Sequence, residues 1–152
     1  MQAEAAAVVG LADAAAIAVV DQRVSDLDDY KIESENDVYF DRDSAILIEA
    51  AKPALANLAK LAKSHQGYLI EISGYASNTL GSKTDQKLSE ERASAVARYF
   101  YEVQNIPMRR ILIPVGYGST HPVASNAHAV GREINRRVDV KVLVNKSFEE
   151  GL

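Results

Sequence analysis

Alternating and helix-spaced apolar residues organise the chain between residues 37 and 145. Around Ile70 and Ile72, apolar and polar residues alternate, which predicts a strand. A polar loop over residues 77–85 follows. An apolar stripe at helical spacing then predicts a helix over residues 89–103, with Ser89 as its N-cap and glutamates in its first turn. The members of that stripe are Ala93, Val96, Ala97, Phe100 and Val103.

Similar patterns predict the other elements. They indicate a short strand over residues 37–40, a helix over 48–65, a third strand over 111–115 and a last strand over 138–144. The prolines refine two of these elements: Pro53 lies at the start of its helix, and Pro114 indicates that the third strand lies at a sheet edge. A long loop is expected between residues 116 and 131.

These elements follow the order strand, helix, strand, helix, strand, strand, or βαβαββ. We expect an α+β fold with two layers, in which two long helices cover one face of a small mixed four-stranded sheet and the other face meets water. The predicted domain spans residues 31–146, ahead of a loose tail over 147–152. Residues 1–30 are predicted to be an alanine-rich helix, which is interpreted either as a spacer or as a coiled coil or packed helix.

Composition argues against several classes of protein. The net charge of −4 argues against a nucleic-acid-binding surface, and the chain has no cysteine for disulfides or thiolate metal sites. The sequence has no nucleophile-elbow motif, no phosphate-binding glycine loop and no metal-ligand spacing, and its three histidines are scattered. We therefore predict no cofactor, no metal and no enzymatic activity.

Several arginines stand out in this acidic chain. Arg92 is placed in the first turn of its predicted helix, where a basic side chain opposes the helix dipole. Arg136 stands where the last strand begins. If that strand lies beside the strand at Ile70, both arginines meet and suit a zwitterion, whose ammonium group an aspartate would bind. The alternative is structural: Arg92 and Arg136 pair with Asp85 and Asp41 and join the loops.

Residues 37–145 resemble an OmpA-like domain, the periplasmic module of outer membrane protein A, of peptidoglycan-associated lipoprotein and of the flagellar stator protein MotB. The resemblance rests on motifs in the same order as in the family. They are VYFD at 38–41 with SA at 44–45, LSEERA at 88–93, GYG at 116–118, PVASN at 122–126 and GREINRRV at 131–138.

The resemblance implies non-covalent binding of peptidoglycan through the diaminopimelate of its stem peptide. It implies that Arg92 and Arg136 contact this ligand. The candidate site consists of Asp41, Ser77, Asp85, Arg92 and Arg136. The implied location is the periplasm, with attachment to the outer membrane through an anchor outside this sequence, so that the domain tethers that membrane to the wall.

One loop departs from the family pattern. Where the family has GHTD, this chain has GYAS at 74–77, so Ser77 replaces the aspartate that binds the ligand and Tyr75 replaces the histidine. Asp85 stands where an asparagine is usual, and we hypothesise that it compensates. The alternative function is a fold that has lost wall binding and acts as a protein-interaction module of the envelope, with a homo-oligomer formed through the N-terminal helix.

Overall fold

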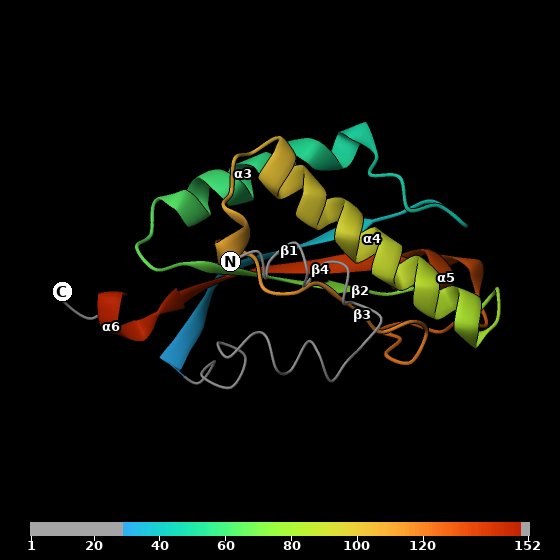
Figure 1. The fold of residues 1–152 in the computed structure, drawn as a ribbon. Helices are drawn as coiled ribbons and strands as arrows, with labels where there is room; N and C mark the ends of the chain where they lie inside the picture. The colour runs from blue at the N-terminus through green and yellow to red at the C-terminus, as the bar shows by residue number, and fades with distance from the viewer. Residues whose placement is uncertain (1–28, 150–152) are drawn as a thin grey trace.

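The computed structural model describes residues 29–149, and these form a two-layer α+β fold (Figure 1). The predicted alanine-rich helix, its oligomer contact and the end of the tail lie outside the described residues. The elements, in chain order, are β1 (Tyr30–Tyr39), the 3-10 helix η3 (Glu49–Ala51), α3 (Lys52–Lys63), β2 (Leu69–Gly74), α4 (Ser82–Glu102), the 3-10 helix η4 (Met108–Arg110), β3 (Val115–Gly116), α5 (Ala129–Asn135), β4 (Arg137–Asn145) and α6 (Lys146–Glu149).

The sheet is mixed and four-stranded, as predicted, with the order β1-β4-β2-β3. The last long strand, β4, lies in the centre and is antiparallel to both β1 and β2, whereas β3 is parallel to β2 at the edge. Helices α3 and α4 lie on the same face of this sheet (Figure 1). Because β1 and β2 run opposite to β4, both of them end where β4 begins, at Arg137.

Alternation along β4 explains its central place. Its four alternate valines point to the helices and are completely or almost completely buried, against Ile70 and Ile72 of β2. The helices contribute apolar residues at helical spacing to the same core. The largest of these are Leu55, Leu58, Val96 and Phe100. The opposite face is not entirely wet, because Leu69, Leu112 and Leu143 form a second, smaller buried cluster there.

Two strands differ from their predictions. The first was expected over residues 37–40, but β1 has ten residues and pairs with β4 from Tyr30 to Tyr39. The first part of β1 was not predicted because its sequence is polar. An edge strand that is hydrogen-bonded to a strongly apolar neighbour needs few apolar residues of its own. The third was expected over 111–115, but only Val115–Gly116 pairs as a strand, beside an isolated bridge between Ile70 and Ile111.

The prediction for α4 was wrong at its start. The helix begins at Ser82, so its first turn contains Asp85, which had been assigned to a loop. Ser89 is not a cap but a fully buried residue inside the helix. Its hydroxyl donates to the carbonyl of Gln86 and accepts from the amide of Gly118, at 2.7 and 2.8 Å. Ser89 therefore joins the helix to the loop after β3.

Two short helices replace predicted irregular segments. Helix α5 begins inside the expected long loop, at Ala129, and ends at Asn135, immediately before β4. Helix α6 forms the start of the tail that was expected to be loose. Neither helix has the long apolar stripe from which helices can be predicted.

The sheet and α4 approach each other closely at Gly74. A Cβ atom there would collide with the carbonyl oxygen of Ser89 and lie 3.1 Å from the Cβ of Ala93. We expect Gly74→Ala to lower the free energy of unfolding by about 1–3 kcal/mol, because α4 would have to move away from β2. Urea unfolding followed by circular dichroism measures this loss. An unchanged midpoint would contradict the close packing described here.

Candidate functional site

Arg92 is the centre of the site, and its side chain is completely buried. Its guanidinium donates three hydrogen bonds, all to backbone carbonyl oxygens. Nε bonds Ser44 at 2.8 Å, Nη1 bonds Tyr75 at 3.1 Å and Nη2 bonds Asp41 at 3.0 Å. These carbonyls belong to the loops that follow β1 and β2. Arg92 therefore attaches both loops to α4.

Among residues 29–149, no carboxylate forms a direct ion pair with Arg92 to neutralise its charge. Burial lowers the pKa of its guanidinium to about 10, and the nearby charge of Arg136 acts in the same direction, whereas Asp43 and Asp85 oppose both effects. At neutral pH the group is still protonated. The site thus contains two guanidinium groups that repel each other and carboxylates that offset this repulsion only in part.

Arg136 lies where β1 ends and β4 begins. Its amide group is the C-cap of α5, and its carbonyl accepts a hydrogen bond from the amide of Phe40 at 2.9 Å. Its Nε donates to the carbonyl of Phe40 at 3.3 Å. The side chain is half-buried, so it is the more accessible of the two arginines.

Asn135 places Arg136 by fixing the preceding loop. Its side chain is fully buried and makes four hydrogen bonds. Oδ1 accepts from the amides of Val123 and Ala124, and Nδ2 donates to the carbonyl of Ala124 and to Oδ1 of Asn126. Every donor and acceptor of the amide is used, so Asn135 has a structural role that the NRR motif does not reveal by itself.

Asp85 is buried and close enough to Arg92 for their charges to interact. Its Oδ1 accepts a hydrogen bond from the amide of Leu80 at 3.2 Å. Burial raises the pKa of the Asp85 carboxyl, while this bond, a second one from Ser119 and the charge of Arg92 act against the rise. Asp85 thus combines a structural bond with a charge near the arginines.

The five predicted site residues differ in how they take part in the site. The charges of Arg136 and Asp85 both act on Arg92. Asp41 contributes its backbone carbonyl, while its side chain is exposed. Ser77 is buried, and its hydroxyl lies 3.2 Å from that of Thr79 in its own loop.

The structural alternative was wrong about the partners, because Arg92 and Arg136 do not form ion pairs with Asp85 and Asp41, but its expectation that the arginines join the loops holds for Arg92. Both arginines bond carbonyl oxygens instead. Carbonyl acceptors leave no trace in a sequence, because every residue carries one. The sequence did offer a signal for Asp43, whose carboxylate acts on Arg92, in the DRDS turn after β1. The backbone of Asp43 is left-handed, with φ of 54°.

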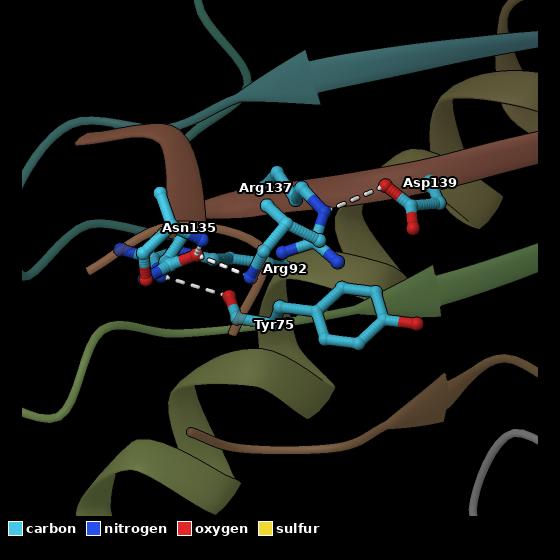
Figure 2. Close-up of polar contacts among 7 residues, drawn as sticks. Tyr75, Arg92, Asn135, Arg137 and Asp139 are labelled. Atoms are coloured by element: carbon cyan, nitrogen blue, oxygen red, sulfur yellow. Dashed lines mark hydrogen bonds and ion pairs between the residues drawn. The ribbon is translucent and has the colours of Figure 1, made fainter. Parts of the chain in front are cut away.

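Tyr75 connects this site to the other face of the sheet. Its carbonyl accepts a hydrogen bond from Arg92, while the centroid of its ring lies 3.9 Å from the guanidinium carbon of Arg137 (Figure 2). Arg137 is buried, and its Nε donates to Asp139 at 2.9 Å. Its Nη1 is buried without a hydrogen-bond partner, which a cation–π contact with Tyr75 partly offsets.

Within residues 29–149, no group of three or more His, Asp or Glu side chains is arranged to hold a metal ion. None of the helices in this part of the chain is long and apolar enough to cross a lipid bilayer.

Comparison with known proteins assigns the chain to a family. The model of the OmpA family matches residues 39–136, which is more than half of the chain. The chain belongs to the OmpA family. OmpA-family domains are non-enzymatic modules associated with peptidoglycan, so the prediction that this chain is not an enzyme is confirmed.

Individual OmpA-family relatives agree with this assignment. The chain is 37% identical over 106 residues to outer membrane porin F of Pseudomonas aeruginosa, covering 70% of this chain and 30% of the porin. It is 36% identical over 105 residues to the peptidoglycan-binding protein ArfA of Mycobacterium tuberculosis, covering 69% of this chain and 32% of ArfA. The chain therefore spans about a third of the length of these two relatives.

A solved structure confirms the fold. The crystal structure of the peptidoglycan-associated lipoprotein from Burkholderia pseudomallei superposes with a TM-score of 0.65 at 28% identity, covering 70% of this chain and 88% of that one. The predicted OmpA-like fold, a mixed four-stranded sheet with helices, is thus confirmed.

Asp139 makes stability depend on pH. It lies opposite Asp37 across β1 and β4. Burial raises the pKa of Asp139 to about 6, and a hydrogen bond and charge from Asp37 act in the same direction, whereas Arg137 opposes them. Because the folded protein then binds more protons than the unfolded chain between about pH 4 and 6, stability contributed by this group is present at low pH and lost as pH rises through 6.

We therefore expect the free energy of unfolding to fall between pH 4 and 7 by roughly 1–3 kcal/mol more in the wild type than in Asp139→Asn. The asparagine keeps an acceptor for Arg137 and does not titrate. Urea unfolding of both proteins over this pH range provides the measurement, and the comparison cancels the contribution of groups that do not interact with Asp139. Parallel pH profiles would show that Asp139 does not titrate in this window.

Proposed function

We propose that this domain binds peptidoglycan non-covalently and does so through the diaminopimelate of the stem peptide. Diaminopimelate ends in a zwitterion, with a carboxylate and an ammonium group on one carbon. The site offers arginines for the first and aspartates for the second. This arrangement is the chemistry that such a ligand requires.

The observation that carries the proposal is the proximity of two like charges. The nearby charge of Arg136 adds to the effect of burial in lowering the pKa of Arg92, whose side chain is completely buried. A ligand carboxylate beside them would relieve this repulsion. Because Arg136 is the more accessible, we place the carboxylate on its side, with Arg92 acting from behind through its charge and through the loops that it holds.

The ammonium group needs a negative partner, and the usual loop carboxylate is absent. Ser77 carries no charge, and its hydroxyl already contacts Thr79. Asp85 and the exposed Asp43 are the carboxylates whose charges reach Arg92. We therefore assign the ammonium contact to Asp85, with Asp43 beside it, as the replacement for the missing aspartate.

The relatives agree with this function at a coarser level. ArfA is named a peptidoglycan-binding protein, and the lipoprotein of similar fold is named peptidoglycan-associated. Porin F is an outer-membrane protein. We propose by analogy that the present chain acts in the periplasm and tethers the outer membrane to the wall, with the membrane attachment supplied from outside residues 29–149.

Calorimetric titration with a diaminopimelate-containing stem tripeptide tests the proposal. We expect saturable binding that Arg136→Gln weakens at least tenfold, because a charge-assisted contact of about 1.5–3 kcal/mol is lost. Arg98→Gln is the matched control, since it removes an exposed arginine from the C-terminal half of α4. Arg92→Ala is unsuitable because it would release both loops. Absence of binding to the folded wild type would refute the proposal.

Asp85→Asn tests the assigned ammonium contact. The asparagine oxygen still accepts from the amide of Leu80, so the midpoint of thermal unfolding should change little. Loss of the charge should weaken tripeptide binding at least tenfold. Calorimetry and thermal unfolding of the same sample separate the two effects. Binding of normal strength by this variant would show that another group takes the ammonium.

A second function remains open because of Ser77. A neutral residue in the ligand loop favours a domain that has lost wall binding and serves as an interaction or oligomerisation module. The same titration separates the two functions, since this alternative requires a folded domain without tripeptide affinity. Ser77→Asp then adds information: a large gain in binding would show that the natural site is weakened at this position.

A further inference from the structure

A cluster of aromatic rings lies beside the proposed peptide site. It consists of Tyr75, Tyr117 and His121, which we call the aromatic cluster. The two tyrosine rings are stacked, with centroids 5.4 Å apart and planes inclined by 19°. The His121 ring stands edge-on to both, at 5.0 Å from Tyr117 and 6.3 Å from Tyr75. Tyr117 and His121 are exposed, so the cluster reaches the surface.

The rings are held in place from several sides. Arg137 lies against the ring of Tyr75, as Figure 2 shows, and is itself bonded to Asp139. The amide of Tyr117 donates to the carbonyl of Gly74 at 2.8 Å. Stacked rings on bonded backbones lose little conformational freedom when they bind, which favours a binding surface.

Hydrogen bonding determines the role of His121. The hydroxyl of Thr120 donates its single proton to the carbonyl of Tyr117 at 2.6 Å. The contact of 2.7 Å between this hydroxyl and Nδ1 of His121 must therefore have Nδ1 as the donor. In the neutral ring this leaves Nε2 as an acceptor, so the cluster adds a hydrogen-bond acceptor to its apolar faces.

The cluster is continuous with the peptide site. The carbonyl of Tyr75 accepts from Arg92, so one residue contributes to both. The loop of Tyr117 is joined to α4, since the amide of Gly118 donates to the hydroxyl of Ser89 at 2.8 Å. An extended tripeptide spans about 10 Å. This length would carry a group at the far end of the stem peptide away from the arginines, and we place that group at the aromatic cluster because Tyr75 belongs to both sites.

We propose that the aromatic cluster binds a sugar ring of the peptidoglycan glycan strand. The proposal rests on the proposed function, because the stem peptide carries the sugar to this place. Aromatic faces suit the C–H surface of a pyranose ring, and an imidazole acceptor suits its hydroxyl or amide donors. Arg137, which lies against the Tyr75 ring, is buried and is paired with Asp139, so it presents no exposed charge to a ligand. The surface thus fits a neutral ligand.

This assignment also gives a reason for the unusual loop. Tyr75, two residues before Ser77, adds a large ring that is covered by Tyr117 and Arg137, so it supports the exposed ring of Tyr117, which would contact the sugar. Contacts with the sugar would offset the weaker contact with the peptide. The domain would then recognise peptide that is still attached to glycan in preference to free peptide.

The test compares two ligands by calorimetry: the free diaminopimelate tripeptide and the same tripeptide on its N-acetylglucosamine–N-acetylmuramic acid disaccharide. We expect the disaccharide ligand to bind the wild type about tenfold more tightly. Tyr117→Leu should abolish that difference while leaving the affinity for the free tripeptide unchanged. Tyr101→Leu, which changes an exposed tyrosine of α4, is the control and should leave both affinities unchanged.

Each other result overturns the proposal in a recognisable way. Equal affinities of the wild type for both ligands would exclude a sugar contact while leaving peptide binding intact. Equal weakening of both ligands by Tyr117→Leu would show that the ring only supports the peptide site. Failure of both ligands to bind the wild type would refute the proposed function and, with it, this inference.

Discussion

A buried positive charge constrains the functional end of this domain. Removing a guanidinium from water is costly unless its donors are bonded, and Arg92 meets this requirement with three carbonyl oxygens from two loops. Those loops cannot move independently while the bonds hold. The ends of β1 and β2, the middle of α4 and the residues around Arg136 therefore form one unit. The hydrogen bonds of Arg92 to the loop carbonyls thus fix the positions of the proposed binding groups, and these bonds form without a ligand.

The sheet topology brings together the two loops that Arg92 contacts. Because β4 is antiparallel to both neighbours, the loops after β1 and β2 meet where β4 begins, at Arg136 and Arg137. Gly74 allows α4 to approach β2 closely enough for Arg92 to reach both loops. Asn135 then fixes the last segment before β4. Ordinary features of packing and backbone bonding thus bring together charges that are far apart in the sequence.

The sequence predicted the buried strands and helices better than the element boundaries and the bonds of Arg92. The alternating valines of β4 and the stripe of α4 predict buried elements, because burial imposes a period on side chains. The start of α4 at Ser82 was missed because polar residues fill its first two turns and Ser89 resembles a cap. The length of β1 comes from pairing with β4, which local sequence does not encode. The motifs indicated Arg92 and Arg136 as site residues, but not that Arg92 bonds carbonyl oxygens.

That last point affects how the loops can change. The acceptors at positions 41, 44 and 75 are main-chain atoms, so a substitution there can alter the side chain and keep the bond. The hydrogen bonds of Arg92 therefore do not depend on which side chains these loops carry. A tyrosine at position 75 is compatible with the bond from Arg92 for this reason. The domain can therefore acquire new ligand preferences without rebuilding the part that keeps it folded.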